Sequence, residues 1–112
     1  MIPDGISFDI ANPKYRQFKS EENILEYTLE GKEITVDWVS GNNATSMMRT
    51  VLSAEGAGVT RISGYVTAKL GRASDAALGR LGDQMAREIG GSWKATVEMI
   101  EGRRYMVFTK RA

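Results

Sequence analysis

Apolar residues recur in this chain with two different periods, and the order in which these periods alternate limits the fold more than any other feature. Side chains three or four positions apart share one face of a helix, whereas alternate side chains share one face of a strand. Helical spacing occurs at residues 44–55 and again after Ser74, up to residue 89. Segments with strand periodicity flank both, so we expect one domain with a sheet and two helices.

Four of the expected strands form two hairpins. These strands are residues 24–30 and 33–39, then residues 93–100 and 104–110. Gly31-Lys32 connects the first pair and Glu101-Gly102-Arg103 the second. Glycine in such a short connection favours the tight turn of a hairpin. A fifth strand is expected at residues 59–69, between the two helices.

The predicted order is therefore β-β-α-β-α-β-β, an α+β fold (α/β, two layers) with a mixed five-stranded sheet. Each helix is expected to connect parallel strands by a right-handed crossover, with the strands in sequential order and both helices on one face. Residues 1–20 are expected to form an irregular N-terminal arm, with a short helix after Asn12-Pro13. Residues 21–112 are expected to form the single α/β domain.

The second helix contains Gly79 and Gly82, and each costs roughly 1 kcal/mol relative to Ala in a helix. We expect close packing of this helix on the sheet to compensate. Ser74 is a good N-cap, and Gly90-Gly91 is expected to end the helix.

The chain has no Cys and no His. This excludes disulfides, thiolate nucleophiles, Cys/His zinc sites and the Ser-His-Asp triad. Any general acid or base must therefore come from groups such as carboxylates or tyrosine. No metal site is expected, and the sequence identifies no cofactor.

Charge is divided unevenly along the chain, although the net charge is only +1. Residues 1–60 carry nine acidic and five basic side chains, whereas residues 61–112 carry five acidic and ten basic ones. The basic half can bind an anionic ligand or partner, or its charges can pair with those of the acidic half within the fold. The apolar runs are too short for a membrane span and no signal peptide is visible, so we expect a cytoplasmic protein with no membrane partner.

One polar segment, residues 40–46, follows a strand and precedes a helix. A loop in this position can offer backbone N–H groups and a positive helix end to an anion, although its Asn and Thr residues are also ordinary helix caps. The expected ligand contacts are Gly41, Asn42, Asn43, Thr45, Ser46, Arg49, Arg61 and Arg72. Arg49 and Arg72 are expected to neutralise phosphate charge.

The fifth strand candidate is expected to place Arg61, Ser63 and Tyr65 on a sheet face that no helix covers. Asp37 on a neighbouring strand is expected beside them. Since no imidazole exists, Asp37 and Tyr65 are the candidates for a catalytic acid or base. The same face is equally compatible with simple solvent exposure.

Two further motifs mark the second half of the chain. They are Met47-Met48-Arg49-Thr50-Val51-Leu52 followed by Ala57-Gly58-Val59-Thr60-Arg61-Ile62, and Ile89-Gly90-Gly91-Ser92-Trp93. With these motifs, residues 33–110 resemble the C-terminal half of GNAT-type N-acetyltransferases. That family has a strand, a pyrophosphate loop, a helix, a strand, a second helix and a closing hairpin. The resemblance implies a GNAT-like half and acyl-CoA binding, although Trp38 and Asn43 replace the family's Arg or Gln and its second small residue.

The small size, the N-terminal arm and the basic C-terminal end are similar to the C-terminal toxin modules of bacterial Rhs and contact-dependent polymorphic toxins. This looser resemblance implies a bacterial effector delivered into a target cell's cytoplasm, with a cognate immunity protein as partner.

Two main hypotheses follow for function. The first is a small effector or toxin-type domain that binds a phosphate-bearing ligand (a nucleotide, RNA or acyl-CoA) at the strand-loop-helix segment. The second is a non-catalytic interaction module that holds a protein partner on its open sheet face. Sequence-independent nucleic-acid binding is a third reading. The sequence leaves open whether the domain is an enzyme.

Overall fold

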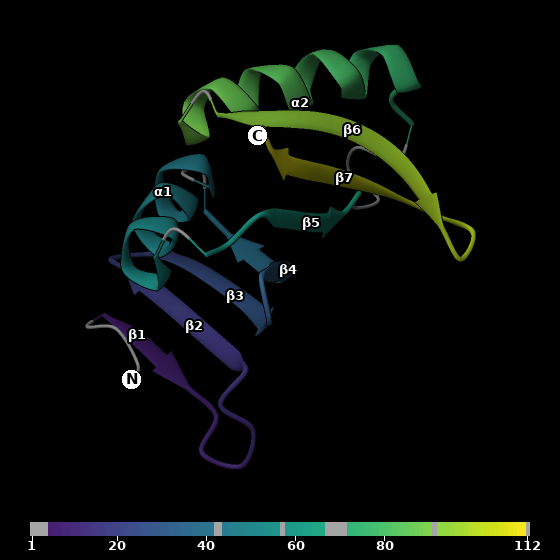
Figure 1. The fold of residues 1–112 in the computed structure, drawn as a ribbon. Helices are drawn as coiled ribbons and strands as arrows, with labels where there is room; N and C mark the ends of the chain where they lie inside the picture. The colour runs from purple at the N-terminus through teal and green to yellow at the C-terminus, as the bar shows by residue number, and fades with distance from the viewer. Residues whose placement is uncertain (1–4, 42–43, 57, 67–71, 91, 112) are drawn as a thin grey trace.

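The computed structural model describes residues 5–41, 44–56, 58–66, 72–90 and 92–111 of the chain. They form one seven-stranded mixed sheet and two helices (Figure 1). Strands hold 47% of these residues and helices 28%, so the fold is rich in β-structure. The strands are β1 (Ile6–Phe8), β2 (Tyr15–Ser20), β3 (Asn23–Glu30), β4 (Glu33–Ser40), β5 (Arg61–Tyr65), β6 (Trp93–Ile100) and β7 (Arg103–Lys110). The helices are α1 (Ala44–Glu55) and α2 (Asp75–Ile89).

The predicted five-stranded sheet is wrong because the first twenty residues contribute two further strands. β1 pairs with β2, and β2 pairs with β3, both antiparallel. The segment after Asn12-Pro13, expected as a short helix, is β2 instead. Its Phe18 packs against the main core and its backbone extends the sheet by six residue pairs. This pairing with β3 satisfies backbone groups that a helix of one or two turns would leave largely unpaired.

The predicted sequential strand order is also wrong. The order is β1-β2-β3-β4-β5-β7-β6, so β7 lies between β5 and β6 and is antiparallel to both. The only neighbouring parallel pair in the described sheet is β4 and β5, which α1 connects. After β5 the chain passes through α2 to the edge strand β6. The hairpin then brings β7 back to lie between β6 and β5. The turn and the alternation that identify a hairpin do not specify which of its two strands pairs with the rest of the sheet.

Both long hairpins are present where they were predicted. β3 and β4 join through Gly31-Lys32, where Gly31 has φ 62°. β6 and β7 join through Glu101-Gly102, and both residues have positive φ, as a tight two-residue turn between twisted strands requires. Arg103, expected in the turn, is the first residue of β7.

Both predicted helices are confirmed. α1 begins at Ala44 and ends at Glu55, and it buries Met47, Met48 and Val51. α2 follows Ser74, whose hydroxyl accepts a hydrogen bond from the Ala77 backbone N–H at 3.1 Å. In Figure 1, α2 runs over β6 and β7, which it contacts, while α1 packs against β2 and β3. The two helices also contact each other, and both supply side chains to one core.

The expected close packing of α2 on the sheet holds for one of its two glycines. A Cβ atom at Gly82 would lie 2.6 Å from Met106 Sδ and 3.0 Å from the Cβ of Ala95. A Cβ atom at Gly79 would meet nothing within 4 Å. Gly82 therefore allows the helix to approach β6 and β7, whereas no such contact compensates for Gly79.

We expect opposite effects from replacing these two glycines with alanine. Gly79→Ala should stabilise the protein by about 1 kcal/mol, because it removes the helix cost of glycine without a clash. Gly82→Ala should destabilise it by about 1–3 kcal/mol, because the added methyl overpacks the interface with Ala95. Urea unfolding of both variants measures the two changes. Equal stabilisation by both would show that α2 does not need glycine at its sheet contact.

A buried ion pair fixes the end of α1 to the sheet. Arg16 on β2 donates to both carboxylate oxygens of Glu55 at 2.5 and 2.7 Å, and the hydroxyl of Tyr27 donates to the same carboxylate at 2.9 Å. The Glu55 side chain is only 3% exposed and Tyr27 only 1%. Burial raises the pKa of Tyr27 well above its usual value, and the hydrogen bond to Glu55 and the negative charge of Glu55 raise it further.

The shifted tyrosine makes stability depend on pH in the alkaline range. An unfolded tyrosine releases its proton near pH 10, whereas folded Tyr27 retains it, so the folded state binds more protons there. Stability should therefore fall as pH rises above about 10. Denaturant unfolding between about pH 8.5 and 11 should show a smaller fall for Tyr27→Phe than for the unchanged chain. The exposed Tyr15→Phe variant corrects for the loss of a phenol, and an identical slope in all three proteins would contradict the assignment.

Candidate functional site

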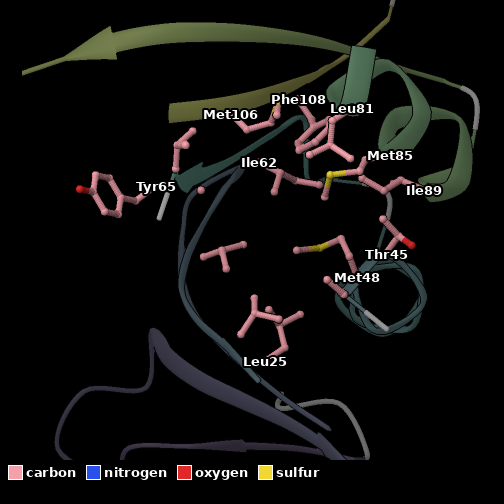
Figure 2. Close-up of a pocket in the computed structure, with 15 residues that line it drawn as sticks. Leu25, Thr45, Met48, Ile62, Tyr65, Leu81, Met85, Ile89, Met106 and Phe108 are labelled. Carbon is pink, nitrogen blue, oxygen red and sulfur yellow. The ribbon is translucent and has the colours of Figure 1, made fainter. Parts of the chain in front are cut away.

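An apolar cavity of about 230 Å³ lies between the sheet and the two helices (Figure 2). Strands β3, β4, β5 and β7 contribute to one wall and both helices to the other. The described lining residues are Leu25, Val36, Val39, Ala44, Thr45, Met48, Ile62, Gly64, Tyr65, Val66, Leu81, Met85, Ile89, Met106 and Phe108. None of these side chains carries a charge, so the interior suits an apolar group.

The cavity lies where β4 and β5 separate. Their parallel ladder ends at the pair Val36 and Gly64, although β4 continues to pair with β3 as far as Ser40. The β3–β4 register shifts between Glu26 and Tyr27, which leaves Asp37 without a partner on β3. Such a bulge bends the strand that carries it. β4 therefore follows β3 away from β5, and the space between the two strands opens toward the helices.

Among the described side chains at the cavity, those of Thr45 and Tyr65 alone carry polar groups. The hydroxyl of Thr45 donates to Glu88 Oε2 at 2.7 Å, so it is already engaged. Figure 2 shows the ring of Tyr65 directed away from the cavity, at the end opposite Thr45 and Ile89. The methionines Met48 and Met85 reach in from α1 and α2. Methionine is unbranched and flexible, so these two side chains can adjust to an occupant.

The two predicted acid–base residues lie beside the end of the same ladder, but only Tyr65 is among the described residues that line the cavity. Asp37 and Tyr65 directly follow Val36 and Gly64, the last pair of the parallel ladder. Asp37 accepts a hydrogen bond from the Thr28 hydroxyl at 2.7 Å. Tyr65 is 48% exposed and packs edge-on against Tyr105, with ring centroids 5.8 Å apart. The sequence prediction that placed the two residues on adjacent strands is consistent with this geometry.

The guanidinium of Arg103 lies 5.4 Å from the ring centroid of Tyr65. A cation in this position is attracted by the ring face. The exposed Tyr65 and Arg103 and the half-buried Tyr105 therefore form one group at the carboxyl end of β5. Sequence analysis missed this group because Tyr65 and Tyr105 meet only when β7 lies beside β5.

The polar loop is described only in part, since Asn42 and Asn43 lie outside the described residues. Gly41 has φ 106°, and a Cβ atom there would lie 1.8 Å from Oδ1 of Asn23. The positive φ favours glycine at this position, and any Cβ there would also require the Asn23 side chain to move. This local packing explains Gly41 without any ligand.

The predicted contacts on α1 lie at its first turns. Ser46 and Arg49 are exposed, and Thr45 is half-buried beneath the Glu88 carboxylate. Glu88 also accepts from the side-chain amide of Gln84 at 3.2 Å. A carboxylate of the protein itself therefore occupies the neighbourhood of the positive end of α1, where an external anion was expected.

Arg61 and Arg72 do not join this site. Arg61 lies on the other face of the sheet, where it pairs with Glu33 at 3.1 Å and, across β7, with Glu98 at 3.8 Å. On the same face, Val107 is fully buried and Ser63 is 6% exposed, so this ion-pair group partly covers the face that was expected to be open. Arg72 is exposed just before α2, and about 20 Å of helix separates the start of α2 from Glu88, the hydrogen-bond partner of Thr45.

The sequence analysis also missed the cavity itself. Of its described lining residues, only Thr45 and Tyr65 were predicted to be site residues. The methionines were the one signal for an apolar site, because methionine is common at adaptable apolar surfaces. Among the described residues, no cluster of three or more acidic side chains is arranged to hold a metal ion. Neither described helix has the length and apolar character needed to cross a membrane.

We expect the charge of Glu88 to weaken anion binding at the start of α1. Glu88→Gln keeps a hydrogen-bond acceptor for Thr45 but removes the negative charge beside the helix end. A helix-end charge effect of 0.3–1 kcal/mol corresponds to roughly two- to fivefold tighter binding of inorganic pyrophosphate. Titration calorimetry at low salt measures this change. Glu22→Gln, in the exposed β2–β3 turn, is the charge-matched control, and an equal gain in both variants would contradict a local effect.

Comparison of the chain with protein-family models, with curated proteins and with solved structures gives no match.

Proposed function

We propose that the protein binds an acyl thioester of the coenzyme A type, a phosphate-bearing ligand, where β4 and β5 separate. The observation that carries the proposal is that an apolar cavity coincides with the end of the only described parallel ladder and with the start of α1. Ligands of α/β sheets commonly bind beyond the carboxyl ends of parallel strands. An acyl thioester has an apolar end for the cavity and an anionic end for the surroundings of the loop.

The lining of the cavity favours this ligand over a nucleotide or RNA. Recognition of a base requires hydrogen-bonding groups or stacked aromatic side chains inside the site. The described side chains of the interior are aliphatic except for Phe108, and among them the one hydroxyl besides that of Tyr65 is engaged by Glu88. A polar base enclosed there would lose its hydrogen bonds to water without replacement.

The free edge of β4 provides a second argument. From Trp38 to Ser40, β4 has a ladder with β3 on one side but no described strand on the other. Backbone N–H and C=O groups at such an edge can pair with an extended chain that contains amides. The arm of coenzyme A between its thioester and its phosphates contains two amides, so it is a suitable occupant of this gap.

The order of the elements also supports the proposal. β4, the loop, α1, β5, α2 and the β6–β7 hairpin follow one another as in the acetyltransferase resemblance described above. Arg49 is exposed in the second turn of α1 and is the nearest candidate in sequence for a phosphate contact. Tyr65 is the one predicted acid–base residue among the described lining residues, so it is the candidate for proton transfer if the acyl group passes to an acceptor. Asp37 accepts from Thr28 and lines a separate hollow of the sheet.

Thermal unfolding with candidate ligands tests the proposal. Hexanoyl-coenzyme A should raise the Tm in a concentration-dependent manner, because it binds only the folded state, whereas ATP and a short single-stranded RNA should not. Gly64→Val should reduce the shift, since its side chain enters the cavity wall. The matched control is Thr35→Val, on β4 and facing away from the cavity. No shift with any thioester, or an equal loss in both variants, would refute the proposed site.

Exposed aromatic residues favour a second candidate, a protein-interaction module. Trp38 is 58% exposed, Tyr15 51% and Tyr65 48%, and all three lie on the side of the sheet opposite α1 and α2. Exposed aromatic side chains are characteristic of interface hot spots. This reading predicts no thioester binding and a partner contact that Trp38→Ala removes. Whether the domain acts as a bacterial effector or toxin is tested separately. A growth defect on expression in bacterial cells would support that role.

A further inference from the structure

We infer that the cavity accepts a medium-length, uncharged acyl chain and selects against both acetyl and carboxylated acyl groups. This inference rests on the proposed function, because it names the acyl group of the thioester at that same site. It is carried by the volume of the cavity, the chemistry of its lining and the direction in which it extends.

The volume is too large for an acetyl group. The cavity measures about 230 Å³, whereas an engineered apolar cavity of roughly 150 Å³ already holds the six carbons of benzene. An acetyl group contributes one methyl and would leave most of the space empty. Empty space forfeits contacts with the surrounding side chains, so a longer chain gains affinity with each added carbon.

The cavity extends away from the strand opening toward the helices. Val36, Gly64 and Tyr65 lie at the strand side, where the thioester would enter. Met85 and Ile89 lie on α2, on the far side in Figure 2. A linear chain that starts between the strands is therefore directed between the two helices. The flexible side chains of Met48 and Met85 allow chains of more than one length to be packed.

The interior offers nothing to a second charge. The described lining residues include no charged side chain, the Thr45 hydroxyl already donates to Glu88, and the Tyr65 ring points outward. A carboxylate at the end of an acyl chain would lose its hydration without a partner. Succinyl and malonyl groups should therefore be rejected although they are small enough to enter.

A chain-length series tests this inference. Binding of acetyl-, butyryl-, hexanoyl-, octanoyl- and succinyl-coenzyme A is measured by titration calorimetry. We expect affinity to rise roughly fourfold per added methylene until the cavity is filled, and succinyl-coenzyme A to bind no better than the acetyl compound. Gly64→Val and Ala44→Leu, which fill the cavity from the strand side and from α1, should move the plateau to shorter chains. Thr35→Val should leave the series unchanged.

A second series without coenzyme A separates this inference from the proposed function. Straight-chain alcohols from butanol to octanol probe the cavity alone. If thioesters fail to bind but alcohols show the same dependence on length and on Gly64→Val, the proposed function is wrong and the chain selectivity of the cavity stands. Thioester binding that does not change with chain length, or the absence of chain-length dependence in both series, overturns the inference.

Discussion

The parallel ladder between β4 and β5 contains only four residue pairs, and the candidate site depends on where it stops. Beyond Val36, the bulge at Asp37 keeps β4 with β3 and turns it away from β5. The two halves of the sheet then diverge on the side where α1 and α2 pack. The helices fill most of this space with apolar side chains, and the remainder is the cavity. A single irregularity in strand pairing thus places an apolar space beside a stretch of β4 that no described strand covers on its β5 side.

The elements that are determined by residues close together in the chain were predictable from the sequence. α1 and α2, the Ser74 cap and the Gly31 turn are specified by residues close to one another in the chain, and the structure agrees with these predictions. Strand order was not predictable in this way. Which strand of the last hairpin faces β5, and whether Tyr15 and Phe18 lie in a strand, depend on partners that are distant in sequence.

The candidate site was predictable only at its edges. Asp37 and Tyr65 were placed on neighbouring strands by periodicity, and this placement agrees with the end of the ladder. Several polar residues that indicated an anion site satisfy one another instead: Thr45 bonds Glu88, and Arg61 pairs with Glu33 and Glu98. The sequence alone does not show whether a polar side chain binds another residue of the protein or an external ligand. The cavity depends on the bulge at Asp37, and a bulge cannot be predicted from the alternation of apolar residues along the strand.

The position of β7 has a consequence for how the chain can fold during synthesis. β5 lies between β4 and β7, but β7 leaves the ribosome after every other strand of the sheet. Until then β5 has its one short partner, and the edge that β7 will cover is open. Such an unpaired edge can join the strands of another chain. The nascent protein is therefore most exposed to misassembly just before its sheet is complete, and fast closure of the β6–β7 hairpin onto β5 shortens that interval.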